Sequence, residues 1–322
     1  MSVTANKTTD VQLGLAWNWQ YDADFIDALD RACGEAGLRC YRVGAHNLKQ
    51  TCLEVETQGR RFAWFLDRAS DDDARFLQLH QLLQQRGTRC FNAQHHYQRS
   101  IEKANLHAEL ALRGLQLPVT VILPAYETQP QFDPLLLDGM PKPFVVKPSR
   151  GGGGAGVMLN VSQPDQVMQS RARLRQQRFL VQQRIEPQRL GGRRAWFRVY
   201  HVCGEVIPCW WDDQTHRYGV LVPADQALVN LDELTRIVRI IAEVAQLDFF
   251  STEIALDTEQ RYVVIDYVND PCDMRLQSKY FDGVPDLIVR QIIAAIIGKV
   301  RREIVRPVTG AAPTAEERRY WP

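Results

Sequence analysis

A glycine-rich segment behind an apolar strand is the part of the sequence whose residue types and spacing point most directly to chemistry. Residues 144–147 read as a buried strand that ends in Lys147, and Ser149 and Arg150 then lead into Gly151, Gly152, Gly153 and Gly154. Glycines let successive N–H groups converge on phosphate oxygens, and a neighbouring lysine supplies compensating charge. The segment matches neither a P-loop nor the spaced glycines of a dinucleotide fold. It predicts a phosphate-binding loop, with a plain glycine linker as the alternative.

A cluster of acidic residues near the end of the sequence is the second chemical signal. Glu253 lies on one predicted strand, and Asp266, Asn269 and Asp270 lie at and after the end of the next. If the two strands pair through a turn at 257–260, these side chains converge at one end of a sheet. Magnesium prefers such oxygen ligands, one or two carboxylates being shared with substrate phosphates. The pattern predicts a magnesium site, and a solvated acidic turn is the alternative.

The elements that must position these residues follow from hydrophobic periodicity. Short apolar runs alternate with amphipathic stretches over the first hundred residues, which is typical of an α/β lobe. The strands predicted there are 11–17, 39–43, 62–66 and 89–92, and the helices are 22–36 and 72–85. Beyond them we predict a helix at 101–115 and strands at 119–123, 141–147 and 179–185. Two antiparallel strand pairs, 196–202 with 206–210 and 249–256 with 261–268, and helices at 231–246 and 285–300 complete the pattern.

The composition is that of a folded protein with several lobes. A chain of 322 residues exceeds the size at which single cores usually stop growing, and 45% hydrophobic and 24% charged residues are ordinary globular values. A net charge of +1 gives no field that would hold nucleic acid or an anionic membrane. We expect neither a signal peptide nor a membrane span, because residues 1–10 are polar and Arg290 interrupts the late apolar stretch. Seven scattered cysteines fit a cytoplasmic protein.

Taken in order, these features resemble the ATP-grasp superfamily of carboxylate–amine ligases. The resemblance covers essentially the whole chain and rests on the Lys147 strand with its glycine loop, the run 179–185, Arg198, and Glu253 followed by Asp266 and Asn269. It implies an α/β fold in which an N-terminal pre-ATP-grasp lobe precedes two α+β lobes that clamp ATP. The expected domains are 1–100 for the first lobe, 101–179 and 180–305 for the ATP-grasp lobes, and 306–322 for a C-terminal tail.

The resemblance also implies a role for each matching residue. Lys103 and Lys147 would contact the nucleotide and its phosphates, and Ser149 with the four glycines would close over the triphosphate. Arg198 would face the transferred phosphoryl group. Taken alone, Lys103 and Arg198 would each indicate a surface ion-pair partner. The implied magnesium ligands are Glu253, Asp266 and Asn269. The implied adenine hinge is Gln182, Gln183, Arg184 and Ile185, with Glu186 facing the ribose.

The sequence departs from the family pattern in two places. Many members carry an acid two residues before the asparagine, but Tyr267 stands there and Asp266 lies one residue earlier. Because side chains alternate along a strand, Asp266 and Asn269 share a side only if a bulge intervenes, and Asp270 is therefore an alternative ligand. Several members also carry an acid shortly before the arginine, where this chain has Trp196. We therefore expect a specialised substrate side.

Candidate substrate contacts come from three segments. Arg68 and Ser70 follow the strand 62–66 at its carboxyl end, where open α/β sheets place ligands. Arg217 lies in the aromatic and charged segment 210–218, and Arg275 lies beyond the metal strand. An ordinary surface loop is the alternative for each segment.

The expected function is that of an ATP-dependent carbon–nitrogen ligase with ATP and Mg²⁺ as cofactors. It would join a small carboxylate, amino acid or peptide-like, to an amine through an acylphosphate and release ADP and phosphate. The alternatives are a small-molecule kinase on the same fold and a nucleotide-binding regulatory protein with impaired chemistry. Both substrates are small molecules in this reading, without nucleic-acid or membrane partners. The sequence leaves substrate identity and oligomeric state open, a homodimer included.

Overall fold

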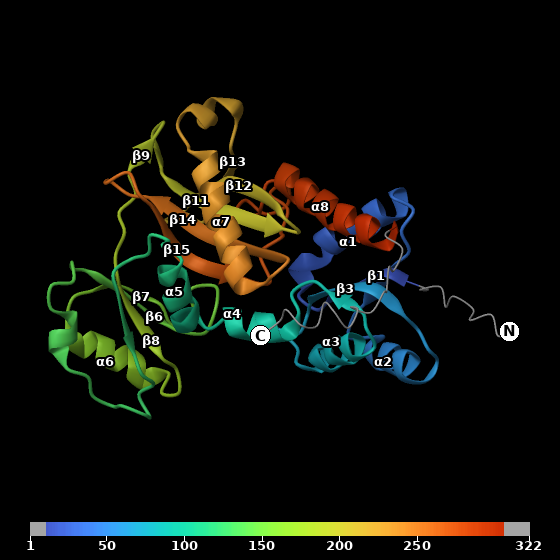
Figure 1. Ribbon diagram of the computed structural model, residues 1–322, viewed down its shortest axis with the longest axis horizontal. Coiled ribbons are helices and arrows are strands. Elements are labelled where there is room, and N and C mark those ends of the chain that lie inside the picture. Colours follow the sequence, from blue (N-terminus) through green and yellow to red (C-terminus); the bar gives the residue numbers. More distant parts are fainter. Residues whose placement is uncertain (1–10, 306–322) are drawn as a thin grey trace, which may run out of the picture.

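The computed structural model describes residues 11–305, which form three main sheets with helices packed on them (Figure 1). The expected tail at 306–322 and the polar start at 1–10 lie outside the described residues. The mixed α/β architecture confirms the predicted fold class. In the part of the chain that is described, no helix combines the length and apolar character needed to cross a membrane.

The N-terminal sheet is parallel and has the strand order β2-β1-β3-β4. Its strands are β1 (Val11–Trp17), β2 (Cys40–Val43), β3 (Phe62–Arg68) and β4 (Arg89–Cys90). Its helices are α1 (Ala23–Glu35), α2 (Leu48–Thr57) and α3 (Arg75–Gln85). Helix α1 buries Phe25, Ile26, Leu29 and Cys33, whose spacing places them on one helical face. The predicted α/β lobe is confirmed, and α2 is an additional helix that the periodicity did not predict.

The second sheet carries the glycine loop and has the antiparallel order β5-β8-β6-β7. Its strands are β5 (Thr120–Leu123), β6 (Phe144–Pro148), β7 (Met158–Val161) and β8 (Phe179–Gln183), and helix α6 (Pro164–Arg173) packs on it. Helices α4 (Gln94–Ser100) and α5 (Lys103–Leu112) connect this sheet to the first lobe. Strand β8 lies between β5 and β6, so the sheet extends to Gln183 and crosses the expected boundary at residue 179.

The third sheet carries the acidic residues and has the order β13-β12-β11-β14-β15. Its strands are β11 (Trp196–Val202), β12 (Glu205–Asp212), β13 (Arg217–Val220), β14 (Phe249–Leu256) and β15 (Tyr262–Asn269). Both predicted antiparallel pairs are confirmed. The first pair turns at Cys203 and Gly204, which adopt φ values of 55° and 96°. A short ribbon of β9 (Arg189–Leu190) and β10 (Arg193–Arg194) precedes this sheet.

Helices α7 (Leu231–Ala245) and α8 (Asp286–Val305) complete two separate cores around the third sheet. Helix α7 packs with Phe197, Val199 and Trp210 of the sheet. Helix α8 packs in a different core, which also contains Tyr200 of β11 and Leu13 of β1. Figure 1 shows α8 lying beside α1, so the last helix joins the third sheet to the N-terminal lobe.

Candidate functional site

Lys147 lies where the second and third sheets meet. The side chain is 7% exposed, and its Nζ donates to the backbone oxygen of Ile265 at 3.0 Å. The same nitrogen lies 5.3 Å from the centre of the Tyr267 ring. Burial lowers the pKa of Lys147 to about 8, although the carboxylates of Asp266 and Glu253 act in the opposite direction. The predicted phosphate-binding lysine and the predicted metal strand are therefore neighbours.

The glycine loop between β6 and β7 offers several backbone donors. Gly151, Gly153 and Gly154 have φ values of 124°, 60° and 74°, conformations that glycine adopts without steric cost. Within the described residues, the N–H groups of 151–154 donate to no protein oxygen. The Nζ of Lys103 donates to the carbonyl of Gly151. The loop thus has unused donors beside two lysines, as anion binding requires.

Ser149 is buried and anchors the loop to helix α5. Its hydroxyl accepts from the N–H of Ala104 at 2.9 Å and bonds the carboxylate of Glu102. Its backbone oxygen accepts from the N–H of Lys103 at 2.8 Å. Glu102 also accepts from Arg150 at 2.9 Å. The hydroxyl is occupied by protein groups, so Ser149 positions the loop in this conformation.

The residues predicted to form the adenine hinge differ in burial and in whether their backbone N–H groups are already hydrogen-bonded. Gln182 is buried, and its amide donates to Thr120 at 2.8 Å and to the Tyr267 hydroxyl at 3.1 Å. Gln183 donates its N–H to a backbone oxygen of the neighbouring segment at 2.8 Å. The N–H groups of residues 184–186 make no hydrogen bond within the described chain. Backbone groups for an adenine ring are therefore available at 184–186 and not at 182–183.

Buried Tyr267 and half-buried His107 form a polar network that sequence reasoning missed. The Nδ1 of His107 lies 2.5 Å from the Tyr267 hydroxyl, which also accepts from Gln182. Burial lowers the pKa of His107 to about 4, so its imidazole is neutral at physiological pH. The network joins α5, β15 and β8. Tyr267 stands where the family pattern has an acid, and that departure was the only signal of it in the sequence.

The acidic residues meet through an irregular strand pair. Glu253 lies opposite Asp266, and register shifts occur on both sides of Glu253. These shifts supply the bulge that a shared side for Asp266 and Asn269 requires, and the Asn269 amide donates to Asp266 Oδ2 at 2.9 Å. The second oxygen, Oδ1, is buried without a hydrogen-bond partner among residues 11–305. An unused buried carboxylate oxygen beside a second carboxylate suits a bound cation.

The residues present fit magnesium only as a shared site. In the described part of the chain, no group of three or more His, Cys, Asp or Glu side chains is placed to hold a metal. Two carboxylates and the Asn269 amide are fewer ligands than a self-sufficient cage needs. Protein-bound Mg²⁺ usually takes one or two carboxylates and completes its shell with water and substrate phosphates. The arrangement fits such a phosphate-completed ion.

Arg198 is held beside Glu253 on the same face of the third sheet. Its guanidinium donates to Glu253 at 2.6 Å and lies 4.7 Å from the centre of the Trp211 ring. Burial acts to lower the pKa of Arg198, but the Glu253 carboxylate raises it above the ordinary value. The indole of Trp196 donates to the other Glu253 oxygen at 3.2 Å. Trp196, the second departure from the family pattern, thus orients an acidic residue of the site.

Asp270 is not brought into this group. Its carboxylate accepts from Asn92 at 2.7 Å and faces charges of the N-terminal lobe. Burial raises the pKa of Asp270 to about 7. The bulge brings Asn269 back to Asp266 and leaves Asp270 on the other side. The placement favours Glu253, Asp266 and Asn269 over Asp270 as ligands.

Arg68 lies inside the protein. It is 3% exposed and makes two hydrogen bonds of 2.8 Å to the carboxylate of Asp22 and another of 2.8 Å to the backbone oxygen of Cys272. These contacts link β3 to the segment after β15. Arg68 therefore has a structural role in this conformation, and its charge is neutralised by Asp22.

The other candidate substrate residues differ in whether their side chains already have a partner within the protein. Ser70 bonds the carboxylate of Asp67. Arg275 is paired with Asp273 at 2.8 Å. Arg217 is exposed and makes no ion pair with any described residue. It begins β13, so the segment 210–218 is a strand hairpin rather than a loop. Arg217 alone among the four presents an unengaged charge.

Solved structures of ATP-grasp ligases share this architecture. The D-alanine–D-alanine ligase from Bacillus anthracis complexed with ATP is 12% identical, with a TM-score of 0.63 over 91% of this chain and 99% of that one. A RimK domain ATP-grasp protein from Sphaerobacter thermophilus is 18% identical, with a TM-score of 0.60 over 88% and 100%. D-cycloserine synthetase DcsG is 16% identical, with a TM-score of 0.60 over 89% and 99%. No protein-family model and no curated protein matches the sequence. The chain therefore has the ATP-grasp fold.

Proposed function

We propose that this chain is an ATP-dependent ligase that joins a small carboxylate to an amine through an acylphosphate. The observation that carries the proposal is the convergence of Lys147 with Asp266 and Glu253 beside a glycine loop whose N–H groups are unused. Arg198 adjoins the same carboxylates. Phosphoryl transfer needs mainly positioning and charge neutralisation, which these groups supply.

ATP would lie between the second and third sheets, where Lys147 contacts the backbone of Ile265. The open backbone groups of residues 184–186 would bind adenine, and Glu186, now paired with Arg194 at 2.6 Å, is the candidate for the ribose. Lys147, Lys103 and the N–H groups of 151–154 would bind the phosphates. The nucleotide would thus bridge two lobes.

Glu253, Asp266 and the Asn269 amide oxygen would hold magnesium. The ion would neutralise charge on the triphosphate as a Lewis acid. Arg198 is fixed between Glu253 and Trp211. It would stabilise the equatorial oxygens of the phosphoryl group during its transfer. The stacked, paired guanidinium is oriented before substrate arrives.

The reaction would proceed in two displacements without a protein nucleophile. A substrate carboxylate oxygen bonds the terminal phosphorus as ADP leaves, and the amine nitrogen then bonds the acyl carbon as phosphate leaves and the amine loses a proton. Burial raises the pKa of Cys209 and of Cys272, two thiols near Arg198, to about 12, so neither is an activated nucleophile. Arg217 is the candidate for binding a substrate anion.

The test is ADP release from the full chain with magnesium-ATP and a panel of amino acids and small carboxylates, each with and without amines. Amine-dependent product with stoichiometric ADP is the expected result. A stable phosphorylated product would instead identify a kinase, and tight ATP binding without turnover would identify a regulatory protein. Lys147→Met should abolish turnover. Lys142→Met, the same change at an exposed lysine just before the strand, is the matched control and should not.

A further inference from the structure

Three aromatic side chains meet where the N-terminal lobe contacts the segment that follows β15. The ring centres of Trp19 and Tyr21 are 5.1 Å apart, and those of Tyr21 and Tyr280 are 5.7 Å apart. The rings are inclined by 60° and 79°, so neither pair is a parallel stack. Trp19 is 40% exposed and Tyr21 is 39% exposed, so parts of both rings remain open to solvent. These three residues form the aromatic cluster.

The aromatic cluster lies at the place where an open α/β sheet usually binds its ligand. The N-terminal sheet has the order β2-β1-β3-β4, so β2 lies on one side of β1 and β3 lies on the other. Where the strand order reverses in this way, ligands bind beyond the carboxyl ends of the two strands. Trp19 follows β1 there, and the amide of Asn18 donates to Asp72, which follows β3, at 2.7 Å. The two strand ends are thus joined beside the exposed rings.

The surroundings of the aromatic cluster are acidic, although the net charge of the whole chain is +1. The three segments 18–24, 67–75 and 270–282 contain nine aspartates, three arginines and one lysine. All four bases are already paired with aspartates of the same segments, namely Arg68 with Asp22, Arg75 with Asp73, Arg275 with Asp273 and Lys279 with Asp24. Asp71 and Asp72 make no ion pair with any described residue. The excess negative charge selects a cation as ligand.

Exposed aromatic rings beside carboxylates bind organic cations, because the face of an aromatic ring carries negative electrostatic potential. The chain itself contains one such contact, since the guanidinium of Arg275 lies 5.7 Å from the centre of the Tyr280 ring. Among residues 11–305, no arginine or lysine occupies the ring of Trp19 or of Tyr21 in this way. These two rings are therefore available to a cation from outside the protein.

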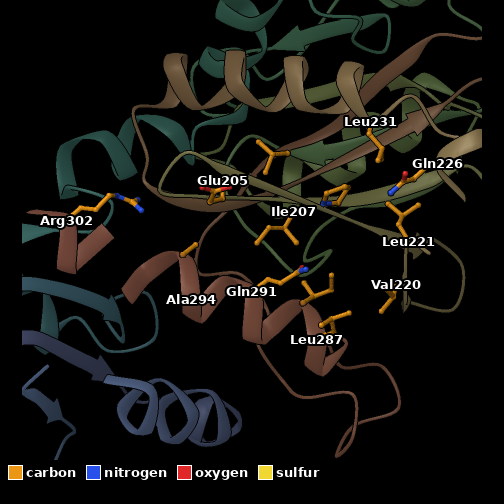
Figure 2. A pocket seen from close by; sticks show the side chains of 14 residues that line it. Glu205, Ile207, Val220, Leu221, Gln226, Leu231, Leu287, Gln291, Ala294 and Arg302 are labelled. Atoms are coloured by element: carbon orange, nitrogen blue, oxygen red, sulfur yellow. The ribbon is translucent and has the colours of Figure 1, made fainter. Parts of the chain in front are cut away.

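The groove between β12 and α8 provides no comparable selection. Its volume is about 580 Å³, and Figure 2 shows Ile207 on one side of it and Gln291 on the other. Its lining contains one acid, Glu205, and one base, Arg302, so the charges balance. The aromatic cluster differs because rings and unpaired acids occur together.

Acidic groups also connect the aromatic cluster with the proposed nucleotide site. Burial raises the pKa of the Tyr97 hydroxyl, and the carboxylates of Asp270 and Asp71 act in the same direction. Both carboxylates therefore lie near Tyr97. Asp71 adjoins Asp72 of the cluster's surroundings, and Asp270 adjoins Asn269 of the metal strand. A substrate bound at the rings would extend along these acids toward the site of phosphoryl transfer.

We propose that the aromatic cluster binds the side-chain cation of a basic amino acid, so that one substrate of the ligase is lysine-like or arginine-like. The proposal rests on the ligase function proposed above. The faces of Trp19 and Tyr21 would contact the cation, and Asp71 and Asp72 would balance its charge. Binding energy gained at this distance from the reacting atoms would orient the substrate.

The test is ligand-observed NMR of the full chain with lysine and with norleucine, which has the same four-carbon side chain without the ammonium group. Lysine should bind about tenfold more tightly. Trp19→Leu should remove the difference, because leucine keeps apolar surface but has no ring. Trp19→Phe should restore most of it. ATP binding and thermal unfolding should be the same in both variants as in the wild type.

The contribution of the acids is tested separately. Asp72→Asn keeps an oxygen that can accept from Asn18 but removes the charge, and it should weaken lysine binding severalfold while leaving norleucine binding unchanged. Asp138→Asn, the same change at an exposed aspartate of the second lobe, is the matched control and should bind lysine like the wild type.

Three results would overturn the proposal: no lysine binding at millimolar concentrations, equal affinity for lysine and norleucine, or a lysine preference that survives Trp19→Leu. These results leave the ligase function intact, because the NMR titration measures binding without turnover. Conversely, selective lysine binding without ADP release for any carboxylate and amine would contradict the ligase function and support the assignment of the aromatic cluster.

Discussion

The ammonium group of Lys147 is buried, so it loses its proton at a pH much closer to neutral than an ordinary lysine does. Its pKa is lowered to about 8 by burial. ATP, an anion, would bind the ammonium form, and bound phosphate would raise the pKa again. As pH rises above 8 the free protein loses this proton, so ATP affinity should fall by up to about tenfold per pH unit.

Calorimetric titration of magnesium-ATP on both sides of pH 8 measures this dependence. Lys147→Met is the control, and its affinity should be weak and nearly independent of pH above 8. Equal pH dependence in the wild type and the variant would show that another group is responsible.

Arg198 should contribute through its geometry as well as its charge. Arg198→Lys keeps the charge but loses the planar contact with Trp211 and the fixed bond to Glu253. We expect kcat to fall by about a hundredfold while ATP affinity changes little, because removal of one preorganised donor typically has that effect. Steady-state kinetics and ATP titration check it. Arg236→Lys, at an exposed arginine paired with Glu233, is the control.

Which site residues could be predicted depended on whether their partners are local. Lys147 and the glycine loop form one continuous segment. Strand alternation indicated only that Asp266 and Asn269 need a bulge to share a side, which the structure has. Arg68 is different, because its partners Asp22 and Cys272 are 46 and 204 positions away. No local pattern shows that its charge is already neutralised. The hydrogen-bond partner of Asp270, Asn92, is also distant in the sequence, so the local pattern indicated a metal ligand instead.

At the level of secondary-structure elements, the Tyr267 hydroxyl links strand β15 to helix α5 and strand β8. Tyr267→Phe removes the partner of His107 and one of the two partners of the Gln182 amide, which keeps its bond to Thr120. We expect a loss of stability of about 1–3 kcal/mol and a higher KM for ATP, because Lys147 and the hinge adjoin this network. Urea unfolding and ATP kinetics measure the two effects.

Tyr262→Phe provides a matched control on the same strand. The Tyr262 hydroxyl accepts from the N–H of Asn230 at 2.8 Å, and Asn230 is not among the residues proposed to bind ATP. This change should also reduce stability but leave the KM for ATP unchanged. If both variants raise the KM equally, Tyr267 acts only through overall stability.

The glycine loop should gain order when nucleotide binds. The N–H groups of 151–154 make no protein hydrogen bond, so we expect fast hydrogen exchange in the free protein. A non-hydrolysable ATP analogue should slow that exchange, because phosphate contacts offset the conformational entropy of glycine. Gly191 and Gly192, which also have positive φ, serve as an internal control. Unchanged protection at 151–154 would argue against phosphate binding there.

Within residues 11–305, the sequence did not predict helices α2, α4 and α6 or the short strands β7, β9, β10 and β13. Strands β1 and β14 are largely buried, and their predicted ends agree with the structure. Helices α4 and α6 were missed because few apolar side chains mark a buried face. In α4 only Ser100 is buried, and α6 buries Arg171 beside Val167. A buried arginine does not contribute to the hydrophobic periodicity from which helices are predicted.

At the scale of the whole molecule, the buried pair of Arg68 and Asp22 should stabilise the junction of the lobes. Arg68→Met leaves the Asp22 carboxylate buried without compensation, and we expect a loss of about 3–5 kcal/mol in urea unfolding. Arg42→Met, which breaks the more exposed pairs with Asp27 and Asp30, should cost about 1 kcal/mol or less. Similar losses in the two variants would contradict a special role for the buried pair.

Helix α8 is the last helix of the described chain, yet Ile292 and Ile296 share a core with Leu13 and Leu15 of the first strand. Protein synthesis runs from the N-terminus, so a ribosome exposes the first strand long before the helix that covers it has been made. The N-terminal lobe cannot complete its core during most of translation. Until α8 leaves the exit tunnel, the nascent chain presents apolar surface that a chaperone would recognise.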